Sequence, residues 1–143
     1  AEALGVPAGP IRRELVAGQP VALPDGRVVH PEEVLGPLTP GARLVHVGDC
    51  GETDDLVAVA RDADALVIEA TYLEVEADMA REFGHLTAGQ AARLARAAVV
   101  RQLYLTHISR RYRERDVIDE AQAIFPGAIV ARDFAHYIVS RTE

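Results

Sequence analysis

The sequence predicts an α/β fold, in which short strands alternate with helices along most of the chain. Three observations support this prediction: short apolar runs recur, segments with the spacing of amphipathic helices lie between them, and turn-forming residues separate the two. With 143 residues, the chain is long enough for one domain with a modest core. We therefore expect a single domain over 1–143, with a lead-in rich in loops and a hairpin (1–42) and an α/β core (43–143).

Glycine and proline interrupt the lead-in too often for a long helix or strand. A hairpin is expected where Asp25–Gly26 separates two short runs, 21–23 and 27–29. Asp-Gly pairs favour this turn because the glycine readily adopts a positive φ. The lead-in is therefore expected to contain only loops and short strands.

The expected strands of the core are short apolar runs: 44–47, 65–68, 102–105, 128–131 and 136–140. The expected helices have apolar residues at helical spacing between turn signals: 56–61, 74–82, 88–98 and 115–124. Thr87 and Gln90 form a capping box for the third of these helices. Pro126 with Gly127 ends the last one, because proline cannot continue a helix.

Composition restricts the location and the partners of the chain. No apolar run approaches the length of a membrane span, and no signal segment occupies the amino terminus. Since the single Cys50 cannot form an internal disulfide, we expect a cytoplasmic protein. The net charge of −7 argues against general nucleic-acid binding but is compatible with local contacts. Five arginines around His107 form either a solvated helix start or a phosphate-contacting patch: Arg101, Arg110, Arg111, Arg113 and Arg115.

Polar side chains follow three of the expected strands. Asp49, Glu69 and His107 each lie at or just beyond a strand end, and His85 stands close to the start of a helix. The carboxyl ends of parallel strands meet at one edge of a sheet, where α/β proteins form their sites. Each residue alone is more often a helix cap or a packed side chain. Together, carboxylates and imidazoles suit zinc or manganese binding and general acid–base chemistry.

Four short motifs contain these residues: Gly48–Cys50, Ile68–Tyr72, Gly84–Ala88 and Leu105–Tyr112. In order and spacing they resemble motifs of ribonuclease Z (tRNase Z), a family of the metallo-β-lactamase fold superfamily: Gly-Asp-Thr, Glu-Ala-Thr, Gly-His-Ser-Thr-Ala and Leu-Thr-His-x-Ser-x-Arg-Tyr. Residues Leu4–Pro10 and Val34–Pro37 also resemble this family. Cys50 replaces the usual threonine, and Ile68 stands where many members carry histidine. The resemblance implies the carboxy-terminal half of a metallo-β-lactamase αββα sandwich.

The resemblance also implies a role for each of the four polar residues. Asp49 would bridge two zinc ions, and His107 would ligate one of them. His85 would protonate the leaving 3′ oxygen of an RNA chain. Glu69 would orient the imidazole of His85 by accepting its other N–H.

The activity implied by the resemblance is that of a zinc-dependent phosphodiesterase, an endoribonuclease that processes the 3′ end of precursor tRNA. Ser109, Arg111 and Tyr112 would bind substrate, since the planar guanidinium of arginine matches the oxygens of a phosphate. The expected partners are precursor tRNA and further copies of the chain in a homo-oligomer, a homodimer. No membrane partner is expected.

The family's main metal cluster, His-x-His-x-Asp-His, does not occur in the sequence. Asp49 and His107 supply two ligands, whereas a stable zinc site needs roughly four, so the isolated chain should bind metal weakly and be inactive. The remaining ligands would come from an amino-terminal half. His30, His46 and His136 lack partners at ligand spacing and are interpreted as structural or surface residues. Two alternatives stay open: another hydrolase or phosphodiesterase of this fold, and a non-catalytic module for assembly or RNA binding.

Overall fold

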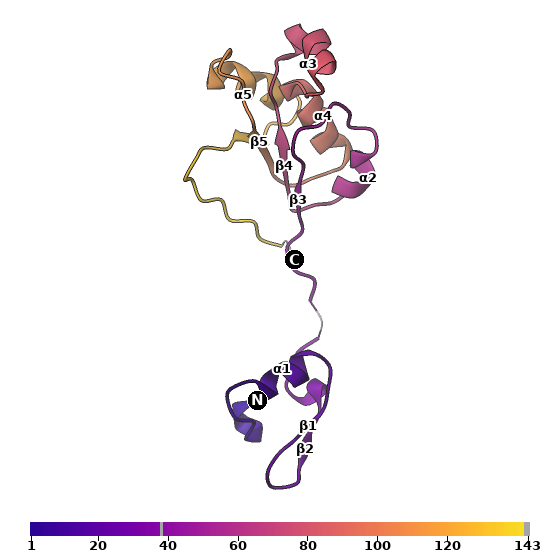
Figure 1. Ribbon diagram of the computed structural model, residues 1–143, viewed down its shortest axis with the longest axis vertical. Helices are drawn as coiled ribbons and strands as arrows, with labels where there is room; N and C mark the ends of the chain where they lie inside the picture. Colours follow the sequence, from indigo (N-terminus) through magenta and orange to yellow (C-terminus); the bar gives the residue numbers. More distant parts are fainter. Residues whose placement is uncertain (38, 142–143) are drawn as a thin grey trace. The chain divides into compact units, whose positions relative to one another are not determined.

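The computed structural model describes residues 1–37 and 39–141 (Figure 1). The chain divides into two compact units, Ala1–Pro40 and Gly41–Glu143, each with its own apolar core. Within the described ranges, no helix is both long and apolar enough to cross a bilayer.

The first unit contains the expected hairpin. Strands β1 (Val21–Ala22) and β2 (Val28–Val29) pair antiparallel, and Gly26 in the turn has a φ of 85°. Short helices accompany the hairpin: η1 (Glu2–Leu4), α1 (Ile11–Val16) and η2 (Pro31–Glu33). Its core is formed by buried apolar side chains: Val6, Leu15, Val21, Leu23 and Val29. The hairpin prediction is confirmed.

Helix α1 is a difference from the sequence-based expectation of loops and short strands. Its six residues fit between Pro10, which precedes the first turn, and Gly18. The buried Leu15 anchors the helix in the small core, and the guanidinium of Arg12 donates to the carbonyl oxygen of Val6 at 2.9 Å. The frequent glycine and proline residues exclude a long helix or strand. They are compatible with a short helix that tertiary contacts stabilise.

Among the described residues, the second unit contains a parallel sheet with the strand order β3-β4-β5-β6. Its strands are β3 (Leu44–His46), β4 (Ala65–Glu69), β5 (Leu103–Thr106) and β6 (Ala128–Val130). Its helices are α2 (Leu56–Ala60), η3 (Glu74–Glu76), α3 (Ala77–Phe83), α4 (Ala88–Ala97) and α5 (Glu114–Gln122). The alternation confirms the predicted α/β class. Thr87 and Gln90 form the predicted capping box at the start of α4.

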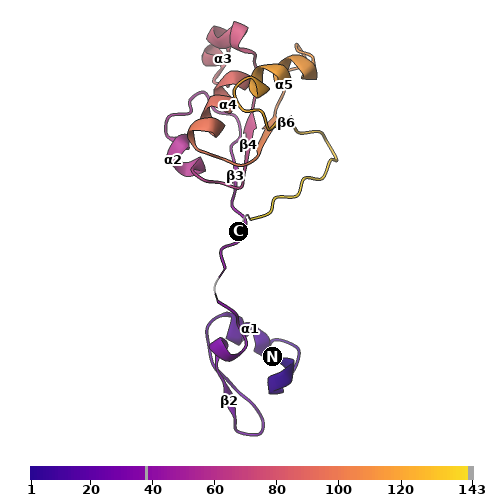
Figure 2. The ribbon, with the colours of Figure 1, turned by 180° about the vertical axis from the view of Figure 1, so that it is seen from behind.

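Helices cover one face of this sheet. Helix α4 contacts β4 and β5, and α5 contacts β6 (Figure 2). Fully buried side chains of the central strands form one core cluster with the apolar side of α4: Leu66, Ile68, Leu103 and Leu105. Burial of each such side chain stabilises the fold by roughly 1.5–3 kcal/mol. This core holds the ends of the central strands in register.

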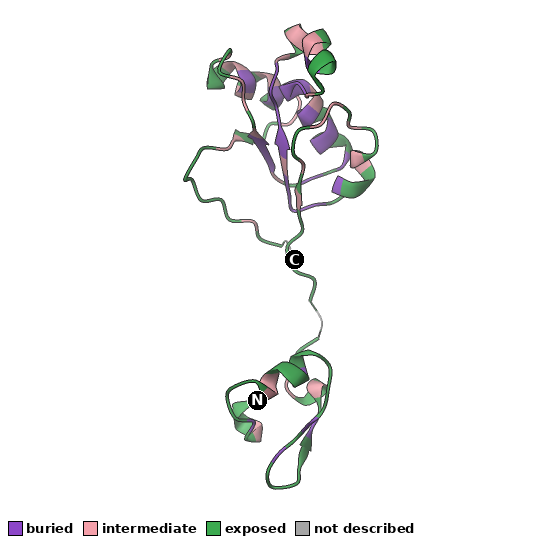
Figure 3. Cartoon of the chain, in the orientation of Figure 1, coloured by how far each residue is buried: buried purple, intermediate pink, exposed green. Residues whose placement is uncertain are grey.

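The opposite face of the sheet is covered less completely. His46, Val67, Tyr104 and Ile129 lie side by side across the four strands and point away from the buried leucines. Buried residues gather on the central strands and on the helix that packs against them (Figure 3). His46 is exposed and Ile129 is 40% exposed, whereas Tyr104 is covered by the ring of Tyr137 at a centroid distance of 4.8 Å. In the part of the chain that the structure describes, this face is therefore partly open, as expected for half of a sandwich.

The strand expected at 136–140 is not present, and this prediction is wrong. The described residues 135–141 are irregular and form no ladder with β6. Tyr137 packs on Tyr104, but Ile138 is 82% exposed. The apolar run Tyr137–Val139 therefore reflects the packing of one aromatic ring on the sheet and not strand pairing.

Candidate active site

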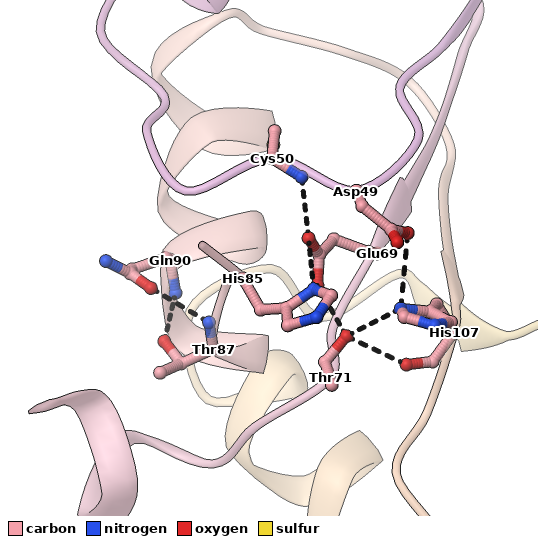
Figure 4. Close-up of polar contacts among 8 residues, drawn as sticks. All are labelled: Asp49, Cys50, Glu69, Thr71, His85, Thr87, Gln90 and His107. Atoms are coloured by element: carbon pink, nitrogen blue, oxygen red, sulfur yellow. Dashed lines mark hydrogen bonds and ion pairs between the residues drawn. The ribbon is translucent and has the colours of Figure 1, made fainter. Parts of the chain in front are cut away.

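The carboxyl ends of three parallel strands bring the predicted site residues together. Asp49 follows β3, Glu69 ends β4, and His107 follows β5 (Figure 4). Glu69 is paired in register with Thr106, so the ends of β4 and β5 lie at the same edge of the sheet. His85 reaches this edge from the turn between α3 and α4, where Gly84 ends α3 with a φ of 70°. The expected convergence at one edge is present.

Asp49, His85 and His107 can each offer one ligand atom, and these atoms all lie within 4.8 Å of one another. Oδ1 of Asp49 is 3.3 Å from Nδ1 of His107, and the two imidazole rings are 5.2 Å apart between centroids. Carboxylate and imidazole are typical zinc ligands. The three residues therefore fit part of a zinc site, and a closed site would need further ligands from outside the described residues.

Glu69 is the centre of the polar contacts and is only 1% exposed. Its Oε1 accepts from the backbone N–H of Cys50 at 2.7 Å, and its Oε2 accepts from the Thr71 hydroxyl at 2.5 Å. Both oxygens lie 3.1–3.2 Å from Nδ1 of His85. An ionised carboxylate can only accept, so Nδ1 of His85 carries a hydrogen and Nε2 is the nitrogen available for proton exchange.

Thr71 is a site residue that the sequence analysis does not predict. Its hydroxyl oxygen lies 2.9 Å from Nδ1 of His107 and 3.0 Å from the carbonyl oxygen of the same residue. The hydroxyl has a single hydrogen, and the Glu69 carboxylate is its strongest acceptor, so Nδ1–H of His107 donates to Thr71. Thr71 therefore connects the carboxylate beside His85 to the second histidine. Its position two residues after Glu69, on the same side of an extended chain, was the available signal.

His107 adopts a left-handed backbone conformation with a φ of 52°. Non-glycine residues rarely adopt this conformation, and those that do are concentrated at functional sites. Since Nδ1 of His107 contacts Thr71 and Asp49, Nε2 is the atom suited to a metal. The Asp49 carboxylate beside this ring would be a further ligand when a metal is bound.

Cys50 is half-buried beside Glu69. Burial, and then the negative charge of Glu69, raise the pKa of its thiol. Zinc ligation by cysteine requires the thiolate. These surroundings favour a neutral thiol and the interpretation of Cys50 as a simple replacement for threonine.

The three predicted substrate-binding residues separate into two groups. Ser109 and Tyr112 line a cavity of about 500 Å³ next to His107, together with Arg132, which the sequence analysis does not single out. Arg111 is not in this lining, and its Nη2 donates to Oε1 of Glu76 at 2.8 Å. The Tyr112 hydroxyl donates to the other oxygen of Glu76. Glu76 thus holds the loop that follows His107 against η3.

The remaining arginines of the cluster are mostly engaged in surface ion pairs. Arg113 pairs with Asp116 at 2.9 Å, and Arg115 pairs with Asp119 at 2.9 Å within α5. The hydrogen bonds that both guanidinium groups donate to the partner carboxylates raise the pKa of these groups. These pairs favour the solvated helix start over a phosphate patch at these positions.

Comparison with known proteins identifies the family. Residues 14–108 match the β-lactamase superfamily domain. The chain belongs to this family. A ribonuclease Z of Bradyrhizobium diazoefficiens is 52% identical over 136 residues, which cover 95% of this chain and 45% of that protein. A ribonuclease Z of Haloferax volcanii is 46% identical over 136 residues, covering 93% of this chain and 43% of that protein.

Solved structures with the same fold include the short form of human tRNase Z. It superposes with a TM-score of 0.56 and 27% identity over 80% of this chain and 36% of that chain. A metallo-β-lactamase fold protein of Bacillus subtilis superposes with a TM-score of 0.58 and 24% identity over 62% of this chain and 36% of that chain, which supports the fold alone. The metallo-β-lactamase half-fold and the resemblance to ribonuclease Z are confirmed. The chain spans about half the length of its curated relatives and corresponds to their carboxy-terminal half.

Proposed function

We propose that this chain forms the carboxy-terminal half of a zinc-dependent phosphodiesterase that processes the 3′ end of precursor tRNA. The observation that carries the proposal is the pairing of His85 with the buried Glu69 directly beside Asp49 and His107. A proton donor next to two metal-type ligands suits the displacement of an alcohol from phosphorus. The relatives named ribonuclease Z support the same activity.

Asp49 and His107 would hold zinc, together with ligands from the portion of the relatives that this sequence does not cover. When bound, zinc supplies a Lewis acid and lowers the pKa of a coordinated water. His85 would donate the proton on Nε2 to the leaving 3′ oxygen. Glu69 would accept Nδ1–H throughout and would stabilise the charged imidazole that precedes this transfer.

The substrate would bind in the cavity beside His107. Ser109 and Tyr112 line this cavity, and the Ser109 hydroxyl can donate to a phosphate oxygen. The Tyr112 hydroxyl would have to leave Glu76 to do the same. Arg111 has several N–H groups besides the one bound to Glu76. With these it would contact the next phosphate of the RNA substrate. We propose that the complete enzyme is a cytoplasmic homodimer. In each subunit, the sheet of the amino-terminal half would cover the partly open face of the sheet described above.

The test requires the complete enzyme, assembled from this chain and the amino-terminal portion of the Bradyrhizobium diazoefficiens ribonuclease Z. Zinc content is measured by emission spectroscopy, and cleavage of a precursor tRNA is measured in parallel. His85→Ala should keep zinc and lower turnover by about 10²–10⁴-fold, the usual worth of a general acid. Asp49→Ala should lose zinc and activity together. The control is His136→Ala, which changes an exposed histidine outside the site.

Two results would contradict the proposal. Loss of zinc from His85→Ala would make His85 a ligand and place the acid elsewhere. Full activity of His85→Ala would remove the proton-transfer role. Calorimetry of the isolated chain should also show weak zinc binding, because Asp49 and His107 supply only two of the roughly four ligands that a stable site needs.

A further inference from the structure

Glu120 joins two segments of the second unit that are distant in sequence. It lies on α5, and its Oε1 accepts from the backbone N–H of Gly89 at 2.8 Å. Its two oxygens also accept from the backbone N–H of Glu74, at 3.2 and 2.9 Å. Gly89 belongs to the first turn of α4, and Glu74 begins η3. Backbone N–H groups in the first turn of a helix have no partner within the helix, and a carboxylate is the favoured acceptor there.

A second carboxylate reinforces this contact. The side chain of Glu74 accepts from the Thr87 hydroxyl at 2.7 Å and from Arg93 at 3.0 Å. The hydrogen bond from Thr87 is the largest cause of a lowered pKa at Glu74. A methyl group on Gly89 would lie 2.7 Å from Oε2 of Glu74 and 3.4 Å from Oε1 of Glu120. Glycine at this position therefore lets the Glu74 carboxylate approach the start of α4 closely.

The two segments held by Glu120 are the same two that carry the Glu69–His85 pair. Residues 69–72 run from the end of β4 toward η3, and residues 85–88 run from His85 into α4. They are joined by a parallel bridge between Tyr72 and Thr87. The N–H of Tyr72 donates to the carbonyl oxygen of Leu86 at 3.0 Å, and the N–H of Ala88 donates to that of Tyr72 at 2.9 Å. Glu120 connects the two segments by hydrogen bonds at the end of the bridge that lies away from the site.

We propose that Glu120 is a positioning residue that holds His85 against Glu69 through the start of α4 and η3. This inference rests on the proposed role of His85 in proton transfer. Glu120 binds the backbone on both sides of the bridge, whereas Glu69 and His85 meet at its other end. Loss of the Glu120 carboxylate would let the start of α4 move away from residues 69–74. The imidazole of His85 would then leave its place beside Glu69 part of the time.

The first experiment compares Glu120→Ala and Glu120→Gln in the zinc-loaded complete enzyme. Glu120→Ala should lower kcat roughly tenfold to a hundredfold, the range expected when a catalytic group is misplaced, with KM and zinc content unchanged. Glu120→Gln keeps one acceptor oxygen and should restore most of the turnover. The matched control is Asp119→Ala, which removes the neighbouring carboxylate on α5, where it pairs with the exposed Arg115.

A double variant separates positioning from a general loss of stability. If Glu120 acts through His85, Glu120→Ala should cause no further loss of turnover in the His85→Ala enzyme. Multiplied losses in the double variant, or full turnover of Glu120→Ala, would overturn the proposal. Retention of full activity by His85→Ala would instead refute the proposed function.

A readout on the isolated chain makes the proposal independent of activity. The proton NMR signals of the His85 imidazole, assigned by their loss in His85→Ala, should shift in Glu120→Ala and return toward their original position in Glu120→Gln. Hydrogen exchange at the amide of Gly89 should accelerate in Glu120→Ala, because this amide loses its acceptor. Faster exchange with unshifted His85 signals would show that Glu120 stabilises α4 without positioning His85, and would overturn the proposal.

Discussion

Replacement of Gly89 by alanine tests how closely the Glu74 carboxylate approaches the start of α4. In an ordinary helix, this change stabilises the protein by about 0.5–1 kcal/mol, because alanine restricts the unfolded chain. Here the new methyl group would lie 2.7 Å from Oε2 of Glu74 and 3.2 Å from Nη1 of Arg93. The first of these separations is too short for a carbon–oxygen contact, so the Glu74 side chain must withdraw.

The cost follows from the hydrogen bonds that Glu74 would lose. A hydrogen bond to a charged group is worth about 1.5–3 kcal/mol. The Glu74 side chain is 47% exposed, so the bond from the Thr87 hydroxyl belongs near the lower limit, about 1.5 kcal/mol. The surface pair with Arg93 adds about 0.5 kcal/mol. After subtraction of about 1 kcal/mol for helix propensity, Gly89→Ala should destabilise the chain by about 1 kcal/mol.

Urea denaturation of the isolated chain, followed by circular dichroism, measures this difference directly. The same substitution made in a Glu74→Ala background should change sign and stabilise the chain by about 0.5–1 kcal/mol, because the crowding carboxylate is gone. Stabilisation of the otherwise unaltered chain by Gly89→Ala, or an equal effect in both backgrounds, would refute the close approach of Glu74 to α4.

Two further predictions concern titration. The Cys50 thiol should react slowly with iodoacetamide at mildly alkaline pH, because burial and the charge of Glu69 raise its pKa. Glu69→Gln removes the second cause and should accelerate the reaction, with the urea-unfolded chain as the upper limit; an unchanged rate would leave burial as the whole cause. The pKa of Glu74 is lowered from 4.5, so its contribution to stability is complete above that pH and is lost as the pH falls through the folded-state value. Below pH 5, the free energy of unfolding measured with urea should therefore depend less steeply on pH in Glu74→Gln than in the unaltered chain. An equal slope in both proteins would contradict the lowered pKa.

Sequence patterns predict much of the second unit because its strands are buried on the helix side. Ala65–Ile68 and Leu103–Leu105 are uninterrupted apolar runs, which is typical of central parallel strands. Thr87 and Gln90 mark the start of α4 with a local hydrogen-bond pattern that depends only on residues three apart. Patterns of this kind involve only a few neighbouring residues, so they predict strands and helix starts without knowledge of the tertiary structure.

The two errors have the opposite origin. Helix α1 is too short to be stable alone and depends on Leu15 in a small core that forms only when the hairpin is folded. Residues 136–140 contain a short apolar run like that of a strand, but among the described residues they form no ladder with β6. Here Tyr137 packs its ring on Tyr104, and its hydroxyl accepts from the backbone N–H of Arg132 at 3.2 Å.

The sequence by itself determined the class of the fold and the residues that converge at the candidate site. Asp49, Glu69 and His107 follow apolar strands, and parallel strands necessarily present their carboxyl ends at one edge. Their order along the chain, with that of His85, was sufficient to indicate the family. These inferences need only the local pattern and the topology that it implies.

Only the tertiary structure decided which groups support the site. Thr71 contacts His107 across 36 residues, Glu76 holds Arg111 across 35, and Glu120 reaches Glu74 across 46. In the sequence these side chains resemble ordinary polar residues of a turn or a helix surface. Hydrogen-bond partners at such separations are set by how α5 and the loop after β5 pack on the sheet, and no local pattern encodes that packing.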